Sequence, residues 1–268
     1  MIDDDDAPIG KLLSRREVLA LFGAGGAALV VACSGSDDGG KTVTQPESAG
    51  PRAPAESSQA ATAPTVSAPN SATLPQCVVR PAQTEGPYFV DEKLNRSDIR
   101  ADANGGTPRA GIPLALTFNV SRVSGANSCA PLASAIVDVW HCDAEGQYSD
   151  VDDRAIGFNT KGQKWLRGSQ NTDASGKATF TTVFPGWYQG RAVHIHFKIR
   201  SGNSEFTSQL FFNESLIDQV YAQAPYKQGK YVRNNEDGIY RSGGSQLMLA
   251  PTRTAEGYAA TFDIALQA

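Results

Sequence analysis

The sequence lacks a basic excess, a long apolar run and a cysteine-rich motif. Its 24 Lys and Arg residues are outnumbered by 28 Asp and Glu, for a formal net charge of -4. A general nucleic-acid binder usually carries a basic excess or stripe, so no nucleic-acid partner is expected. The apolar run at 18–32 has 15 residues, short of the roughly 20 that span a bilayer as a helix. The 4 cysteines form no CxxC pair, which leaves a zinc ribbon or a thioredoxin-type site unsupported.

The first 33 residues have the layout of an export signal. Basic residues precede the short apolar run, and small residues follow it, as in a signal peptide. The stretch Ser14–Leu19, which contains two adjacent arginines, resembles a twin-arginine export signal. The run that ends at Cys33 resembles a lipobox, so Cys33 is the candidate lipidation residue. We therefore expect an exported protein in the bacterial periplasm or on the cell surface, with membrane contact only through a lipid anchor. A plain signal peptide with an incidental cysteine is the alternative.

Residues 34–76 predict a disordered linker, and the folded domain is expected at 77–268. The linker is rich in Ser, Ala, Thr, Pro and Gly, so it cannot bury enough apolar surface to offset its ordering entropy. The first 76 residues hold all of the net negative charge, because 77–268 contains 19 acidic and 19 basic residues. The charge of the chain therefore says nothing about a substrate or partner.

Cysteine arithmetic predicts one disulfide and one free thiol in the exported domain. If Cys33 is lipidated, three cysteines remain, at Cys77, Cys129 and Cys142. Cys129 and Cys142 bracket a strand candidate that would hold them apart. Cys77 is therefore the better partner for one of the two, and the residues do not decide between them.

The segment 77–268 predicts an all-β fold, a β-sandwich of mixed topology with long functional loops, with an open barrel as the related alternative. Its strand candidates are rich in Val, Ile, Phe and Thr and are separated by clusters of turn residues. They are Leu114–Arg122, Ala135–His141, Ala178–Val183, Ala192–Arg200, Thr207–Phe212, Gln246–Leu249 and Tyr258–Leu266. A short helix is expected at Ser215–Gln223. Loops such as 143–176 are long for a minimal sandwich, and long ordered loops tend to carry function.

Two of the three histidines lie two residues apart on one strand candidate. Because side chains alternate along a strand, His194 and His196 share a face with Lys198 while the apolar residues between them face the core. Imidazoles at this spacing can reach one metal ion. Two hydrogen-bonded surface histidines are the plain alternative, and Lys198 is expected to reach solvent.

Two further segments bring tyrosines toward this strand. A Pro-Gly turn at 185–186 leads to Tyr188 and Arg191 just before the histidines. The strand candidate at 135–141 runs into a glycine-containing loop that presents Tyr148. His141 is expected to be structural, and the acidic run Asp150–Asp153 is expected to be a solvated loop, because it lacks the EF-hand spacing.

Together these motifs resemble the intradiol ring-cleavage dioxygenases, the protocatechuate and catechol dioxygenase superfamily. The resemblance covers most of 77–268 and includes Thr84–Tyr88, the segment from Asp138 to Tyr148, Pro185–Tyr188, Arg191 and the histidine pair. It implies a non-haem Fe(III) held by Tyr148, Tyr188, His194 and His196. It also implies catalytic roles for Arg191 and for Tyr188, the latter as a displaced ligand acting as base, and a substrate pocket bordered by Tyr88, Gln209 and Arg191.

The residue types suit that chemistry. Tyrosinates are hard anionic oxygen donors that favour Fe(III), and a bound metal lowers the pKa of a coordinated hydroxyl. The implied reaction joins a small aromatic 1,2-diol with O2 and gives a muconate-type diacid, with Arg191 stabilising the negative charge on the ring. The six-residue step from Tyr188 to His194 is shorter than the family's usual loop, which opens one wall of the pocket. The family's helical dimerisation region has no counterpart here, so an oligomer is possible but not implied.

Two other classes of function compete with this prediction. A non-catalytic surface β-sandwich could bind polysaccharide or protein through its aromatic residues. A copper or zinc site could use the same histidine pair. The binding module gives no reason for Tyr148, Tyr188, His194 and His196 to coincide. The tyrosine pair separates the copper or zinc site from the first prediction, because tyrosinate bound to Fe(III) gives a red visible absorption that zinc cannot give.

Overall fold

A computed structural model describes residues 77–125 and 128–267. The expected export signal at 1–33, with Cys33, and the expected linker at 34–76 lie outside these residues. The expected domain at 77–268 coincides with the described part except at 126–127 and 268.

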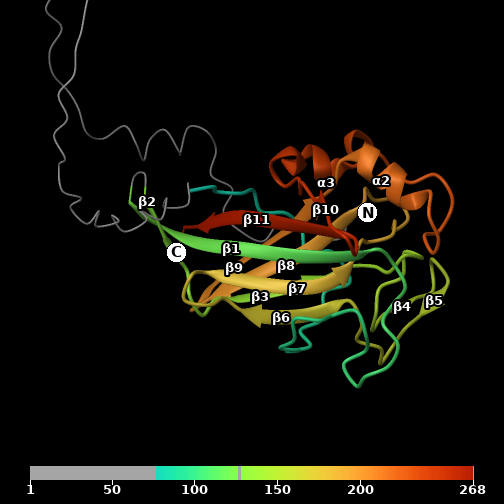
Figure 1. Ribbon diagram of the computed structural model, residues 1–268, viewed down its shortest axis with the longest axis horizontal. Coiled ribbons are helices and arrows are strands. Elements are labelled where there is room, and N and C mark those ends of the chain that lie inside the picture. The colour runs from blue at the N-terminus through green and yellow to red at the C-terminus, as the bar shows by residue number, and fades with distance from the viewer. Residues whose placement is uncertain (1–76, 126–127, 268) are drawn as a thin grey trace, which may run out of the picture.

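The domain is built from two main β-sheets (Figure 1). The first is centred on β1 (Pro113–Gly125), which pairs in parallel with β11 (Tyr258–Leu266) and antiparallel with β2 (Ser128–Pro131) and β7 (Lys177–Val183). The short β10 (Thr252–Arg253) pairs with β11 at the edge. The second sheet has the order β6 (Arg167–Asn171), β3 (Ile136–Trp140), β8 (His194–Ser201) and β9 (Ser204–Phe211). One parallel pair among antiparallel ones confirms the predicted all-β sandwich of mixed topology.

The core lies between the two sheets. Alternate residues of β1 from Leu114 to Val120 are buried and face the second sheet. Phe197 on β8 contacts Phe118 on β1 and Phe262 on β11, with ring centroids 5.3 and 5.6 Å apart. Burying one such phenylalanine contributes roughly 1.5–3 kcal/mol. The apolar face of the histidine strand therefore anchors that strand in the core, as the alternation predicts.

The register of the second sheet sets up one row of side chains across all four strands. Arg167 on β6 pairs with Trp140 on β3, Trp140 pairs with His196 on β8, and His196 pairs with Gln209 on β9. Residues directly opposite each other in a sheet project from the same face. The row therefore places four side chains from distant parts of the sequence side by side.

One end of the sandwich carries the irregular elements. In Figure 1, α2 (Glu214–Tyr221), α3 (Gly238–Arg241) and the hairpin of β4 (Asp152–Asp153) and β5 (Phe158–Asn159) gather at the right-hand end. Two 3-10 turns, η2 (Asn234–Glu236) and η3 (Gly244–Gln246), flank α3. The helix α2 begins where the Asn213 side chain accepts a hydrogen bond from the Ser215 amide, which caps its first turn. The strand β8 starts with His194, which pairs with Phe211 just before α2, so this end also holds the histidines.

Most predicted strands are confirmed, and one is wrong. The strand expected at Gln246–Leu249 is instead the end of η3 followed by a single bridge between Met248 and Phe211. The Gly-Gly pair before it starts a 3-10 turn, with Gly243 at a φ of 103°, a conformation that favours glycine. Conversely, β6 was not predicted, because its sequence Arg-Gly-Ser-Gln-Asn has no apolar alternation. The short helix expected at Ser215–Gln223 is confirmed as α2.

The cysteines behave as the arithmetic predicts. Cys77 and Cys129 form a disulfide bond, with Cα atoms 5.5 Å apart and a sequence separation of 52. Cys142 is free and buried. In the described part of the chain, no helix is long and apolar enough to cross a membrane.

Candidate metal centre

The two histidines of β8 point their rings at each other inside the protein. His194 and His196 are each 3% exposed, and their Nε2 atoms are 2.9 Å apart. Ile195 between them is fully buried on the opposite face. The pattern that predicted a shared histidine face is therefore confirmed, and that face is buried rather than open.

Burial disfavours the charged form of both imidazoles, and the His194 ring directs a lone pair into the cluster. His194 Nδ1 lies 2.6 Å from the Ala192 carbonyl; a carbonyl only accepts, so Nδ1 carries the hydrogen and Nε2 is left with its lone pair. Burial, helped by the positive charge of Arg191, lowers the pKa of His194 to about 3. Burial likewise lowers the pKa of His196 well below its ordinary value. Neutral imidazole is the form that binds a metal.

Tyr148 brings an oxygen atom to the histidines. Its hydroxyl lies 3.2 Å from His194 Nε2, and its side chain is 1% exposed. Burial raises the pKa of the Tyr148 phenol well above its ordinary value, against the opposing positive charges of Arg191 and Arg167. A cation in contact with the oxygen would reverse that direction, because it stabilises the phenolate.

Tyr188 lies beside Tyr148, with its hydroxyl turned toward other partners. The two rings meet edge to face with centroids 5.7 Å apart. The Tyr188 hydroxyl donates to Asp153 Oδ2 at 3.1 Å and also shares a short hydrogen bond with the Tyr88 hydroxyl. Three of the four predicted ligands are thus in mutual contact, and Tyr188 is their neighbour.

Asp153 was predicted to be part of a solvated loop, and that interpretation is wrong for this residue. Its carboxylate accepts hydrogen bonds from both Tyr88 and Tyr188. Its backbone lies in the β4–β5 hairpin, which the polar sequence did not reveal. A run of acidic residues predicts an exposed loop, and only the fold shows that two tyrosine hydroxyls contact Asp153.

Arg191 is held by two partners at the edge of the cluster. Its Nη2 donates to Gln209 Oε1 at 2.7 Å, and its Nε donates to Asp237 Oδ2 at 3.0 Å. Asp237 is 3% exposed and also accepts from the Ala192 amide at 2.7 Å, so it fixes the turn that leads into the histidine strand. Gln209 donates in turn to the Thr84 carbonyl at 3.0 Å. Sequence reasoning missed Asp237, which lies 46 residues beyond Arg191 and in no motif.

The segment 84–89 covers the cluster. Gly86 has a φ of 71°, and a Cβ built on it would lie 3.3 Å from His196 Cε1, so a larger residue would press on that ring. The Tyr88 ring stacks on the Tyr148 ring, with centroids 4.7 Å apart. The residue that follows Thr84, Glu85, pairs with the Lys198 ammonium and ties this cover to β8.

The expectation that Lys198 reaches solvent is wrong. Lys198 is 4% exposed, pairs with Glu85 and with Glu205 at 2.5 Å, and lies over the Phe89 ring with Nζ 4.2 Å from its centroid. Charged side chains are buried in this way only when they are paired. The covering segment supplies Glu85 and Phe89, and β9 supplies Glu205, so Lys198 anchors the cover to the sheet.

His141 has the structural role expected of it. Its Nδ1 lies 2.8 Å from the Cys142 carbonyl, and its Nε2 lies 2.7 Å from Thr182 Oγ1. Both ring nitrogens are therefore used. Trp140 stacks on His196 with centroids 4.9 Å apart and planes 6° apart.

The donor set fits a metal that accepts phenolate oxygen. Among the described residues, no group of three or more His, Cys, Asp or Glu could hold an ion, so the histidine pair needs tyrosine to complete a site. Ligand atoms about 2.1 Å from one ion and at right angles are about 3 Å apart. The 2.9 and 3.2 Å spacings of the two imidazoles and the phenol match that separation. Two neutral nitrogens with hard phenolic oxygens suit ferric iron.

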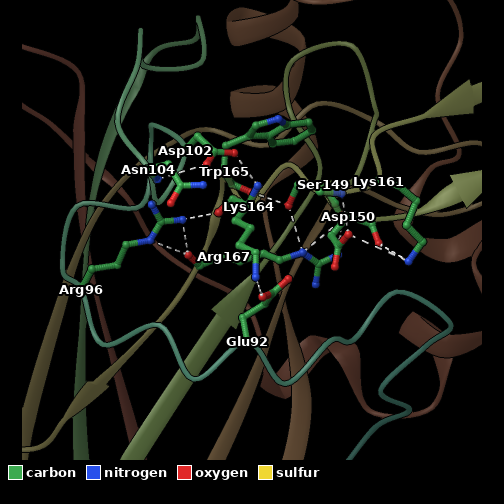
Figure 2. Close-up of polar contacts among 11 residues, drawn as sticks. Glu92, Arg96, Asp102, Asn104, Ser149, Asp150, Lys161, Lys164, Trp165 and Arg167 are labelled. Carbon is green, nitrogen blue, oxygen red and sulfur yellow. Dashed lines mark hydrogen bonds and ion pairs between the residues drawn. The ribbon is translucent and has the colours of Figure 1, made fainter.

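Behind Tyr148 lies a polar network that the sequence did not predict (Figure 2). Arg167 is 3% exposed and reaches Ser149, which follows Tyr148 directly. Nearby, Lys164 pairs with Glu92, and Arg96 holds the carbonyl of Arg167. None of these residues stands in a motif, so only the fold identifies them.

Comparison with known proteins agrees with this geometry. A family model described as "Dioxygenase" matches residues 84–268, more than half of the chain. A curated relative, catechol 1,2-dioxygenase 2 of Acinetobacter lwoffii, is 30% identical over 164 residues, which cover 46% of this chain and 57% of that protein. The match therefore spans little more than half the length of that relative.

Solved structures are similar over nearly their whole length. An intradiol ring-cleavage dioxygenase from Tetranychus urticae has a TM-score of 0.60 and 29% identity, over 73% of this chain and 94% of that one. The dioxygenase domain of a dioxygenase carbohydrate-binding protein fusion from Streptomyces sp. SirexAA-E has a TM-score of 0.51 and 26% identity, over 70% and 98%. With the family match, these likenesses show that the chain belongs to the intradiol ring-cleavage dioxygenase family.

Proposed function

We propose that this protein is a non-haem Fe(III)-dependent intradiol dioxygenase. It cleaves the bond between the two hydroxyl-bearing carbons of a catechol-type aromatic and gives a muconate-type diacid, with both atoms of O2 entering the product. The observation that carries the proposal is a buried cluster in which the two imidazoles lie 2.9 Å apart and the Tyr148 phenol lies 3.2 Å from His194. The family is known to use non-haem iron, which suits this donor set.

Tyr148, Tyr188, His194 and His196 would hold the iron. When bound, Fe(III) would lower the pKa of the substrate hydroxyls and activate the ring toward O2. The His194 Nδ1 hydrogen bond to Ala192 fixes one ring, and the Trp140 stack fixes the other. Fixed ligand orientations reduce the cost of assembling the site.

Tyr188 is the residue suited to move a proton. Asp153 and Tyr88 both form hydrogen bonds with its hydroxyl, so these residues would stabilise a Tyr188 side chain that is not a metal ligand. As a phenolate, Tyr188 would accept a proton from the incoming diol at its phenolic oxygen, and the resulting phenol would stay hydrogen-bonded to Asp153 and Tyr88. Asp153 and Tyr88 hold that proton at the Tyr188 oxygen.

Arg191 would stabilise negative charge on the substrate ring. Its guanidinium stays charged, and its Nε and Nη2 are committed to Asp237 and Gln209, which fix its direction. A fixed positive charge stabilises developing negative charge without reorganisation. Tyr88 and Gln209 would border the bound substrate, which we take to be a small aromatic 1,2-diol because the similar proteins are catechol and chlorocatechol dioxygenases.

The place of action is part of the proposal. The arginine pair at 15–16, the short apolar run and Cys33 support export and a lipid anchor, which would place the enzyme in the periplasm or at the cell surface. Labelling with a radioactive fatty acid would test this. A Cys33→Ser variant that still takes up the label would refute the anchor.

The test of the activity is metal analysis, a visible spectrum and oxygen uptake on the purified full chain. We expect about one iron per chain, a red absorption and uptake with catechol, protocatechuate or hydroxyquinol. A colourless, iron-free protein that is inert to all three would refute the proposal. A colourless protein with stoichiometric zinc would favour the alternative that the histidine pair is a zinc site.

A further inference from the structure

One buried guanidinium is committed to the residue next to Tyr148. Arg167 Nη2 and Nε donate to the Ser149 carbonyl at 2.6 and 3.1 Å, and Nε also donates to the Ser149 hydroxyl at 2.9 Å. Figure 2 shows the side chain directed at Ser149. None of the ion pairs between described residues includes Arg167. The side chain of Arg167 is therefore held mainly by its hydrogen bonds to Ser149.

The backbone carbonyls of Tyr148 and of the residue after it are both held by side chains. Thr160 Oγ1 donates to the Tyr148 carbonyl at 2.5 Å, and Arg167 takes the next carbonyl along the chain. The Ser149 hydroxyl donates to the Trp165 carbonyl at 2.6 Å. Immediately afterwards the chain turns at Asp150, which has a φ of 54°. A tyrosine in a loop keeps one direction only if its backbone is fixed in this way.

Arg167 also neighbours the histidine side of the cluster. It pairs with Trp140 across the sheet, and Trp140 pairs with His196 and stacks on its ring. The same guanidinium thus borders Tyr148 by way of Ser149 and His196 by way of Trp140.

We propose that Arg167 is a positioning residue that fixes Tyr148, through Ser149, at the spacing from His194 and His196 that one ion requires. The nature of that ion rests on the proposed function, whereas the fixing of Tyr148 does not. Arginine suits the role because its planar fork places two donors on one carbonyl. Lysine would retain the charge and lose the fork.

The test compares three full-chain variants. Arg167→Met removes the fork and keeps an apolar stem, and Arg167→Lys is the conservative rescue. Arg96→Met is the matched control, because Arg96 also holds carbonyl oxygens, those of Ala101, Lys164 and Arg167, and has no hydrogen bond to Ser149. The measurements are hydrogen–deuterium exchange of residues 147–151 in the iron-free protein, iron affinity, and the tyrosinate-to-iron absorption band.

We expect Arg167→Met to raise exchange at 147–151 several-fold and to shift the band. It should also weaken iron binding by about 10- to 100-fold, as loss of a residue that orients a metal ligand does. Arg167→Lys should fall between this variant and the wild type, and it carries the test if the Met variant does not fold. Arg96→Met should leave exchange at 147–151 unchanged. Unchanged exchange in both Arg167 variants, or equal loosening in Arg96→Met, would overturn the proposal.

Iron in the wild type separates this inference from the proposed function. An iron-free, colourless wild type refutes the proposed function, and the exchange comparison still decides whether Arg167 fixes Tyr148. If the wild type binds iron and Arg167→Met has the same absorption band and iron affinity as the wild type, the positioning role is refuted and the proposed function stands.

Discussion

At the scale of single residues, the candidate metal centre consists of side chains in direct contact and of other side chains that hold them in place. Tyr148, His194 and His196 come together as the motifs predict. Asp237 and Arg167 act on the cluster from segments without any pattern, and the fold alone shows their contacts. Alternation along a strand tells which face a side chain occupies, and it cannot tell what covers that face.

Tyr148→Phe tests the phenol oxygen directly. Because the ring still fills its buried site, we expect the variant to fold. It should lose or shift the red band, bind iron at least tenfold more weakly, and lose most oxygen uptake, since a ligand oxygen is gone. Absorption spectra and metal analysis measure this. A variant with full iron content and an unchanged spectrum would show that the ligand assignment is wrong.

His141 predicts how stability depends on pH. Burial lowers the pKa of His141 to about 4 in the folded protein, against about 6.5 in an unfolded chain. Between these values the unfolded state binds one more proton, so stability is fully present above pH 6.5 and falls toward pH 4 by about 1.4 kcal/mol per unit.

The matched control is His141→Gln, whose amide can replace both hydrogen bonds without titrating. The free energy of unfolding, measured with urea between pH 7 and 4, should depend on pH more steeply in the wild type than in the variant. The difference in slope should correspond to about one proton. The other two histidines titrate in both proteins and cancel in the comparison. Equal slopes would contradict the pKa assigned to His141.

At the scale of elements, strands with apolar alternation were predicted and strands defined by pairing were not. β1, β8 and β11 follow their patterns, because each packs one face on the core. β6 is a strand only because β3 offers it five consecutive partners. The segment at 246–249 has strand-like residues but follows a left-handed glycine that starts a turn.

Gly146→Ala tests whether the two tyrosine loops must pack closely. A Cβ at Gly146 would lie 2.2 Å from the Trp187 carbonyl oxygen, next to Tyr188, so the loops of Tyr148 and Tyr188 must separate. The control is Gly162→Ala, which has a nearly equal φ, 84° against 82°, and no atom within 4 Å of the added Cβ. Both variants bear the strain of a left-handed alanine.

Thermal unfolding and iron content should distinguish the two glycine variants. Gly162→Ala should lose about 1 kcal/mol or slightly more from backbone strain and retain its iron. Gly146→Ala should lose at least about 2 kcal/mol more, as overpacking does, together with most of its iron. Equal losses in the two proteins would mean that the close contact between the loops does not matter.

At the scale of the whole molecule, β8 lies inside one of the two packed sheets, with its apolar face in the core. Loops from one end of the sandwich cover its histidines. The disulfide from Cys77 to Cys129 fastens the start of the domain to β2. The domain therefore has the expected β-sandwich, and its three cysteines form the expected single disulfide and one free thiol. The covering segment, which Glu85 and Lys198 fasten, was not predicted, because it depends on an ion pair between residues 113 positions apart.

The most direct test of intradiol cleavage is the mass of the product formed from catechol by the full chain under 18O2. The account predicts a muconate-type diacid that carries two 18O atoms, one in each new carboxyl group. A product with a single 18O atom, a ring cleaved beside rather than between the hydroxyl-bearing carbons, or unchanged catechol from iron-loaded protein would contradict it.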